Sequence, residues 1–251
     1  MFLVEPGDLA AAADGGTYLL GGSEGRHAGV VQRRSPGERV DVVDGAGVRV
    51  RGTVEAVTAD GVVLRVVERV EEPTPEIALV LVQALAKGDR DELAIEAATE
   101  VGADAVVPWQ AERSVVVWRG ERAAKSRARW VGTVRTATKQ SRRARVPDVA
   151  AAVDTATLAG RVRATVADGG AVLVLHEEAT EPIATVPLGT ADAARSVLVV
   201  VGPEGGISDR ELALLVGGGA RAVRLGPHVL RTSTAGPVAL ALLAQRLGRW
   251  A

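Results

Sequence analysis

The sequence predicts an α/β protein in which a small β-rich domain precedes a larger domain built on a parallel sheet. The chain has 251 residues, 47% of them apolar, which is enough for a sizeable core and, at about 100–150 residues per domain, for two domains. Residues 26–70 alternate apolar and polar side chains between turn signals, a pattern typical of antiparallel strands. After residue 77, apolar runs alternate with helical segments, which indicates buried parallel strands covered by helices on both faces.

The N-terminal region alternates strand and turn signals. Asp44-Gly45 and Asp60-Gly61 mark the turns, because glycine readily adopts the positive φ that tight hairpins require. We expect a small β-barrel over residues 1–72. The segment EEPTPE (71–76) then predicts a linker, since its two prolines fit neither a central strand nor a helix interior.

The second domain is expected over residues 73–251. Its predicted strands are short apolar runs at 77–85, 105–108, 171–176, 196–201 and 222–226. Helices are expected at 89–102, ended by Gly102, through most of the basic segment described below, after residue 208, and at 234–248.

The composition excludes several kinds of chemistry. Without Cys the chain has no disulfide, no thiolate metal site and no thiol nucleophile. The three His, at 27, 176 and 228, lack ligand spacing, so we expect no metal. Acidic residues near the N-terminus, and the lack of an apolar run approaching about 18 residues, argue against a signal peptide and a membrane span. We therefore expect a cytoplasmic protein with no membrane partner.

Basic residues are concentrated in one segment. Between Arg119 and Arg145 lie ten Lys or Arg and one acid, Glu121, so this segment carries +9 although the whole chain carries −1. A block of one sign indicates an anionic partner, nucleic acid above all. The chain has only six aromatic residues, so contacts with RNA should depend on charge more than on base stacking.

Three loops follow strands of the second domain: 175–178 (LHEE), 202–208 (GPEGGIS) and 225–236 (LGPHVLRTSTAG). In open α/β sheets ligands bind outside the carboxyl ends of the strands, so these loops are the expected pocket. Ser208 and Glu211 stand at capping-box spacing, which predicts a helix start directly after the glycines. The turn lacks the Gly-Lys-Ser/Thr ending of a phosphate loop and the G-x-G-x-x-G pattern of a dinucleotide site. A glycine-rich turn that binds no ligand remains the alternative.

The sequences GPEGGISDRELALL (202–215) and LGPHVLRTSTAGPVALALL (225–243) closely resemble motifs of the SPOUT class of RNA methyltransferases. Within that class the chain is similar to RsmE-type enzymes, which methylate N3 of a uridine in 16S ribosomal RNA. Residues 26–45, 85–116 and 136–149 also resemble characteristic stretches of that family. The resemblance implies a PUA-like RNA-binding barrel, a SPOUT domain with a trefoil knot, S-adenosylmethionine (SAM) as methyl donor, and a homodimer.

By the same resemblance, the three loops form the cofactor pocket, largely through backbone groups. The neutral adenosine part of the cofactor needs shape and backbone hydrogen bonds, which glycines and small residues can provide. The residues expected to bind the cofactor are Leu175, His176, Gly202, Pro203, Glu204, Gly205, Gly206, Leu225, Gly226, Leu230, Arg231, Thr232, Ser233, Thr234 and Ala235. The family often has Glu at the position where this chain has Ser233.

Methylation at N3 of uridine requires loss of the N3 proton, so a base or a positive charge that stabilises the anion is needed. Without Cys, direct transfer governed mainly by positioning remains. Arg231 is the first candidate for stabilising the anion, and a structural pair with a carboxylate is the alternative. Glu204 is a candidate base or substrate ligand, against the alternative that it caps the following helix. His176 could titrate near neutral pH, although a satisfied polar residue at a strand end is the commoner case.

The residues expected to contact RNA are Lys87, Arg90, Arg113, Lys139, Gln140, Arg142 and Arg143. For the first three, ion pairs with Asp89, Asp91 or Glu112 are the alternative.

Further cations remain open to either interpretation. Arg122, Lys125 and Arg129 recur at helical spacing, which fits RNA contacts and a solvated helix face equally well. For His27 and for Arg33-Arg34 in the barrel, solvation is the favoured interpretation.

The resemblance therefore implies SAM-dependent methylation of N3 of a uridine in 16S rRNA of the small ribosomal subunit. The alternatives are a SPOUT ribose 2′-O-methyltransferase and a non-catalytic RNA-binding protein of ribosome assembly. The presence of both cofactor motifs argues against the latter, because a binding module does not need them. The apolar closing helix at 237–247 favours the implied dimer, although burial in the core explains it equally well.

Overall fold

The computed structural model describes residues 1–189 and 196–250 and divides the chain into two compact units. The first unit comprises Met1–Thr74 and Thr138–Val146, and the second comprises Pro75–Ala137 and Pro147–Ala251. Residues 138–146 thus belong to the first unit, together with the N-terminal part of the chain. Within it, Ala144 is buried in a cluster with Leu3 and Val43.

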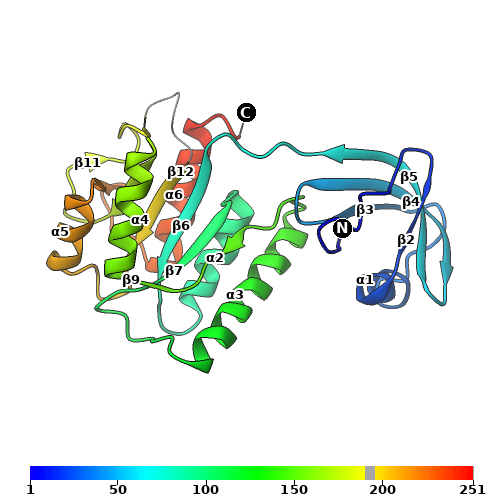
Figure 1. The fold of residues 1–251 in the computed structure, drawn as a ribbon, viewed down its shortest axis with the longest axis horizontal. Helices are drawn as coiled ribbons and strands as arrows, with labels where there is room; N and C mark the ends of the chain where they lie inside the picture. The colour runs from blue at the N-terminus through cyan, green and yellow to red at the C-terminus, as the bar shows by residue number, and fades with distance from the viewer. Residues whose placement is uncertain (190–195, 251) are drawn as a thin grey trace. The chain divides into compact units, whose positions relative to one another are not determined.

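The first unit contains a five-stranded sheet in the order β1-β3-β4-β5-β2, which forms a half-barrel (Figure 1). Its strands are β1 (Phe2–Leu3), β2 (Thr17–Leu20), β3 (Arg39–Val43), β4 (Val48–Thr58) and β5 (Gly61–Glu71). The expected barrel is therefore open, with β1 and β2 at its edges. The predicted hairpins are present, because antiparallel β3, β4 and β5 follow one another through turns at Asp44 and Asp60.

One part of the first unit differs from the prediction. Residues from Arg26 onward were expected to begin a strand, but α1 (Gly22–Arg26) runs into the π-helix η1 (His27–Val31). Alternating apolar residues suggested a strand here, yet Val30 and Val31 are 65% and 68% exposed and only Ala28 of η1 is buried. The short period-two pattern therefore does not correspond to a buried face.

The second unit is built on an eight-stranded sheet with the path β11-β13-β10-β12-β6-β7-β8, and β9 also pairs with β7. All of its pairings are parallel. The strands are β6 (Ala78–Ala84), β7 (Ala105–Gln110), β8 (Asp148–Val149), β9 (Val153–Asp154), β10 (Ala171–Leu175), β11 (Glu181–Pro182), β12 (Ser196–Val201) and β13 (Arg221–Arg224). The predicted α/β class and its five predicted strands are confirmed.

Helices cover both faces of this sheet. They are α2 (Arg90–Val101), α3 (Glu121–Gln140), α4 (Thr155–Ala167), α5 (Asp209–Gly217) and α6 (Thr232–Arg246). In Figure 1, α2 and α6 pack together on one face, against β6 and β12, while α4 and α5 lie on the other. Helix α4 was missed, although Asp154 caps it by accepting a hydrogen bond from Thr157 N at 2.8 Å.

A glycine allows α6 to approach the sheet closely. A Cβ atom on Gly236 would lie 2.8 Å from Leu81 Cδ1 and 3.4 Å from Val201 Cγ2. The first turn of α6 therefore packs directly on β6 and β12. The knotted threading that the resemblance implies stays a prediction.

No helix in the described part of the chain is long and apolar enough to cross a membrane. Residues 1–189 and 196–250 also contain no group of three or more His, Asp or Glu that could hold a metal ion.

Candidate active site

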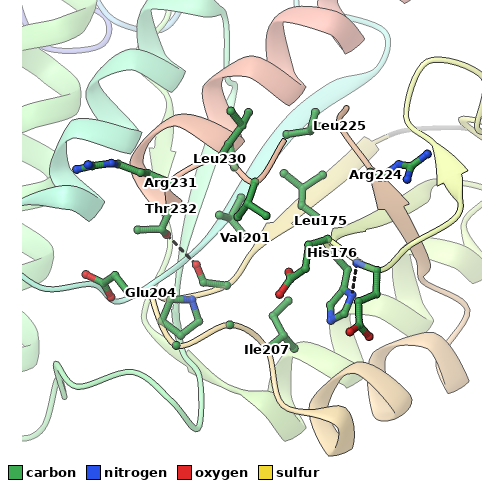
Figure 2. A pocket seen from close by; sticks show the side chains of 18 of the residues that line it. Leu175, His176, Val201, Glu204, Ile207, Arg224, Leu225, Leu230, Arg231 and Thr232 are labelled. Atoms are coloured by element: carbon green, nitrogen blue, oxygen red, sulfur yellow. Dashed lines mark hydrogen bonds between the residues drawn. The ribbon is translucent and has the colours of Figure 1, made fainter. Parts of the chain in front are cut away.

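A cavity of about 740 Å³ lies at the carboxyl ends of β10, β12 and β13 (Figure 2). Its walls come from the three loops that follow these strands. Such a volume is typical of small-molecule sites, which span roughly 300–1,000 Å³. The cavity therefore lies where ligands bind in open α/β sheets.

All the residues expected to bind the cofactor line this cavity except Ser233 and Thr234. Other lining residues fall inside the three predicted loops: Glu177, Glu178, Ile207, Pro227, His228 and Val229. Val201, Asp209 and Arg224 flank those loops, and sequence reasoning missed them. Arg90 and Arg113, expected to contact RNA, also line it. They come from the start of α2 and from the connection between β7 and α3.

The glycine-rich turn after β12 is shaped by its own close contacts. A Cβ on Gly202 would lie only 2.7 Å from Ile207 Cγ1, and Gly206 has a φ of +74° that favours glycine. Directly after the turn, Ser208 and Glu211 form both hydrogen bonds of a capping box, as predicted. The turn is thus held in one conformation at the start of α5.

The loops are tied together by a buried polar chain that sequence reasoning missed. Gln83, fully buried in β6, donates from Nε2 to Thr232 Oγ1 at 2.9 Å and to Ala84 O at 3.1 Å. Thr232 Oγ1 donates in turn to Gly202 O at 2.7 Å. This chain links the ends of β6 and β12 to the first turn of α6. The only sequence signal was a polar residue inside an otherwise apolar strand.

Glu204 serves as an acceptor for a neighbouring loop. Its Oε1 accepts hydrogen bonds from Arg90 Nη1 at 2.8 Å and Lys87 N at 3.1 Å. Burial raises the pKa of Glu204, but hydrogen bonds from its own backbone, Arg90 and Lys87 outweigh this effect and lower the pKa below its usual value. A lowered pKa makes a carboxylate a weaker base. The expected alternative, a cap for α5, is wrong because Ser208 fills that position.

Arg231 is exposed and stands at the N-cap position of α6. In the described part of the chain its guanidinium has no hydrogen bond or ion pair, so the carboxylate partner offered as an alternative is not found there. Figure 2 shows its side chain pointing away from Leu175 and Ile207, on the same side of the cavity as Glu204. The charged group is therefore free to meet a ligand.

His176 has a local partner. Its Nδ1 accepts a hydrogen bond from Glu178 N at 3.3 Å, and its backbone N donates to Val223 O at 3.0 Å. The first contact requires Nδ1 to be unprotonated, so a neutral ring carries its proton on Nε2. This arrangement corresponds to the satisfied polar residue considered from the sequence.

The lining of the cavity is both apolar and charged. Apolar side chains of Leu175, Val201, Ile207, Leu225 and Leu230 line its middle. In Figure 2, Glu204 and Arg231 lie on one side of the cavity, and Arg224 and His176 lie on the other. Such a site can enclose an uncharged ring system and present its reactive group to a second, anionic molecule.

The other candidate RNA contacts have varied surroundings. Arg90 pairs with Glu204 rather than with Asp89 or Asp91, and Arg113 Nη1 donates to Gly205 O at 2.9 Å rather than pairing with Glu112. Lys87 is exposed, and its backbone N donates to Glu204 Oε1. The other four candidates, which belong to the first unit, are Lys139, Gln140, Arg142 and Arg143.

Within the first unit, Lys139 Nζ pairs with Glu24 at 2.7 Å. The carbonyl of Arg142 accepts from Arg49 at 2.8 Å, and Arg142 itself has a φ of 59°. Gln140 is exposed and Arg143 is half-buried. Through its ion pair with Glu24, Lys139 therefore stabilises the first unit.

Comparison with known proteins defines the class of this chain. A family model described as an RNA methyltransferase domain matches residues 72–244. The ribosomal RNA small subunit methyltransferase E of Mycobacterium bovis is 50% identical over 236 residues, covering 94% of this chain and 89% of that protein. This chain belongs to the ribosomal RNA small subunit methyltransferase E family.

Solved structures agree over the whole chain. The enzyme of the same name from Neisseria gonorrhoeae, bound to S-adenosyl methionine, is 25% identical with a TM-score of 0.81, covering 98% of this chain and 96% of that one. A Legionella pneumophila protein in complex with SAM is 28% identical with a TM-score of 0.80, covering 98% and 97%. Both units of the fold are therefore those of this family.

Proposed function

We propose that this chain transfers a methyl group from SAM to N3 of a uridine in 16S rRNA of the small ribosomal subunit. Family membership supports rRNA of the small subunit as the substrate, and the SAM-bound relatives support the donor. The observation that supports N3 as the site of transfer is Arg231, which lines the cavity, is exposed, and has no hydrogen bond or ion pair with any described residue. Uridine N3 becomes anionic when it loses its proton, which a free guanidinium would favour.

The cavity fits SAM in shape and charge. The apolar side chains of Leu175, Ile207 and Leu225 suit an adenine ring. A Cβ on Gly226 would meet no atom within 4 Å, so the backbone there stays open to a ligand. The lining also holds carboxylates, of Glu177, Glu178, Glu204 and Asp209, and guanidinium groups, of Arg90, Arg113, Arg224 and Arg231. It can therefore pair with the cationic sulfonium and amine of SAM and with its carboxylate.

SAM, when bound, supplies an electrophilic methyl group. Thr232 and Gly202 hold the two loops in register, so that the donor and the base meet in a fixed geometry. Arg231 would orient the uracil and stabilise the anion that forms when N3 gives its proton to water, which is the form able to accept a methyl group. Glu204 acts mainly by holding Lys87 and Arg90 beside the cavity, because its lowered pKa weakens it as a base.

The test is methyl transfer from labelled SAM to small ribosomal subunits from a strain that lacks this gene, followed by nucleoside mass spectrometry. We expect 3-methyluridine. A ribose-methylated nucleoside would retain the fold and the donor but overturn the site of transfer. No transfer to either subunits or naked rRNA would favour the non-catalytic RNA-binding alternative.

We also propose that the chain works as a homodimer in the cytoplasm, where its rRNA substrate is found. Val238 and Leu242 lie four residues apart on α6 and are 37% and 40% exposed, which leaves an apolar face for a second copy. Light scattering at working concentration should give twice the chain mass. A monomer would remove this proposal.

A further inference from the structure

We propose that residues 112–125 form a surface that guides single-stranded RNA to the methyl-transfer cavity; this inference rests on the proposed function. The surface combines the irregular connection between β7 and α3 with the first turns of α3. It extends from Arg113, which lines the cavity, to Lys125. Four observations support this proposal. The segment is anchored at both ends, it exposes apolar side chains, its cations have no partner among the described residues, and it is continuous with the cavity.

The connection is anchored at its cavity end. Glu112 N donates to Glu211 Oε1 at 2.9 Å, and Ser208 Oγ donates to Glu112 Oε2 at 2.6 Å. Glu112 also pairs with Arg210. Arg113 donates to Gly205 O in the glycine-rich turn. The connection is thus fixed to the loop that shapes the cavity.

The other end of the connection is held by aromatic packing. Trp118 is 8% exposed and lies edge-on to Trp130 of α3, with ring centroids 5.1 Å apart. Its backbone N donates to Gln110 Oε1 at 3.3 Å. Between the two anchors, Val115 and Val117 are 64% and 41% exposed. A segment fixed at both ends that still presents apolar side chains to solvent is suited to a ligand.

The cations of the basic segment divide into two groups. Several are used inside the protein: Arg127 donates to Val149 O at 2.9 Å, Arg129 pairs with Glu92 at 2.5 Å, and Lys139 pairs with Glu24. Arg145 donates to the carbonyls of Ala46 and Glu72. The sequence count of ten cations therefore overstates how many are available to RNA.

The second group lies on the proposed surface. Arg119, Arg122 and Lys125 are exposed and have no hydrogen bond or ion pair with any described residue. Arg122 and Lys125 are three apart on α3, so they share a face. Close like charges repel one another unless an anion lies between them. Phosphates supply such an anion, and the exposed valines offer contact to bases or riboses.

Single-stranded RNA fits this surface better than a duplex. Methylation of N3 requires a uridine whose Watson–Crick edge is unpaired, and RNA loops present such splayed bases. Arg119 follows Arg113 by six residue steps, which span at most roughly 20 Å, so a base in the cavity and a phosphate at Arg119 are a few nucleotides apart. An acidic ribosomal protein is the rival occupant.

The test compares two charge-matched double variants. Arg122→Gln/Lys125→Gln changes the proposed surface, and Arg161→Gln/Arg163→Gln removes the same charge from exposed positions on α4. Binding of a fluorescein-labelled oligouridylate is measured against salt concentration. We expect the first variant to bind the oligouridylate about tenfold more weakly than wild type. The slope of log binding constant against log salt concentration should decrease in magnitude by about 1.4, or about 0.7 for each phosphate that is no longer neutralised. The second should stay within about twofold of wild type.

A second pair tests the apolar part. Val117→Asp and Val216→Asp place a carboxylate at positions of similar exposure, 41% and 44%, on the proposed surface and on α5. Only Val117→Asp should weaken oligouridylate binding and raise the KM for small subunits. Unchanged SAM affinity and thermal unfolding in both variants exclude misfolding as the cause.

The outcomes separate this inference from the proposed function. Equal weakening by the α3 and α4 double variants, or no effect of either, overturns the surface even if wild type forms 3-methyluridine. A defect on assembled subunits but not on oligouridylate or naked rRNA overturns RNA as the occupant in favour of a ribosomal protein. If wild type transfers no methyl group yet binds RNA through Arg122 and Lys125, the surface stands and the proposed function fails.

Discussion

Thr232→Val tests how the ends of β6 and β12 are held to the start of α6. Valine keeps the shape of threonine but removes a hydroxyl that accepts from Gln83 Nε2 at 2.9 Å and donates to Gly202 O at 2.7 Å. Gln83 is 0% exposed and Thr232 is 7% exposed, so water does not readily replace the missing hydroxyl. The change therefore removes one buried and one half-buried hydrogen bond without a change of volume.

The expected cost follows from these two bonds. Each neutral hydrogen bond contributes about 1 kcal/mol, and a carbonyl left without its donor costs about 1–3 kcal/mol, with Gly202 O at the low end of this range because it is half-buried. We expect Thr232→Val to lower the free energy of unfolding by roughly 2–4 kcal/mol. Thr232→Ser is the control, because it keeps the hydroxyl and loses one methyl group, worth about 1 kcal/mol. Ser and Val have similar helix propensities, so that factor cancels.

Urea unfolding followed by the fluorescence of buried Trp109 and Trp130 measures these differences. Calorimetry should also give a SAM Kd about tenfold weaker for Thr232→Val, about 1.4 kcal/mol, since Thr232 and Gly202 line the cavity. In a double-mutant cycle with Gln83→Met, the two changes should be non-additive because they remove the same bond. A Thr232→Val protein as stable as Thr232→Ser would refute the reasoning.

Four further changes probe the site. Arg231→Ala should abolish methyl transfer while SAM affinity stays within about tenfold, and near-normal turnover would remove Arg231 from the mechanism. Because the pKa of Glu204 is lowered, its stabilising contribution is present above its unfolded pKa of about 4.5 and is lost as the pH falls through the folded pKa. The stability difference between wild type and Glu204→Gln should therefore be constant from about pH 5 to 8 and vanish in acid; a difference that titrates near neutral pH would contradict this. Gly206→Ala should cost about 1–2 kcal/mol in thermal unfolding, because φ is +74° while the nearest atom to its Cβ is 3.7 Å away, and an unchanged melting temperature would contradict this. Glu211→Ala should lower the free energy of unfolding by about 2–4 kcal/mol, because it leaves Thr155 Oγ1 and two backbone N–H groups without their acceptor. A loss below about 1 kcal/mol in thermal unfolding would argue against this.

The strands of the second unit could be predicted because burial on both faces requires continuous apolar runs. The missed helix α4 had weaker signals: Asp154 as a cap, and Leu158 and Val162 four apart on the buried face. In the first unit, the strand expected near Val30 is a π-helix, since a short alternating pattern does not reveal which side chains are buried. The sequence pattern therefore predicted an element correctly where its apolar positions were also the buried ones.

The loops of the candidate site could also be located from motifs, but their contacts could not. Gln83 and Thr232 lie 149 residues apart, and Arg90 lies 114 residues from Glu204. These pairs meet because β6 is hydrogen-bonded to β12 in the sheet. Strand order is set by the packing of the whole sheet and not by the residues of either strand. The positioning residues of the site therefore remained hidden although the motifs were visible.

The basic segment shows the same limit for charge. Arg122 and Arg127 look alike in the sequence, yet Arg127 is held by the carbonyls of Val149 and Ala150 while Arg122 has no partner in the described part of the chain. Every residue has a backbone carbonyl, so no sequence pattern marks the one that will accept from an arginine. A run of positive charge therefore predicts that an anion is bound. Only the folded chain shows which cations remain free to bind it.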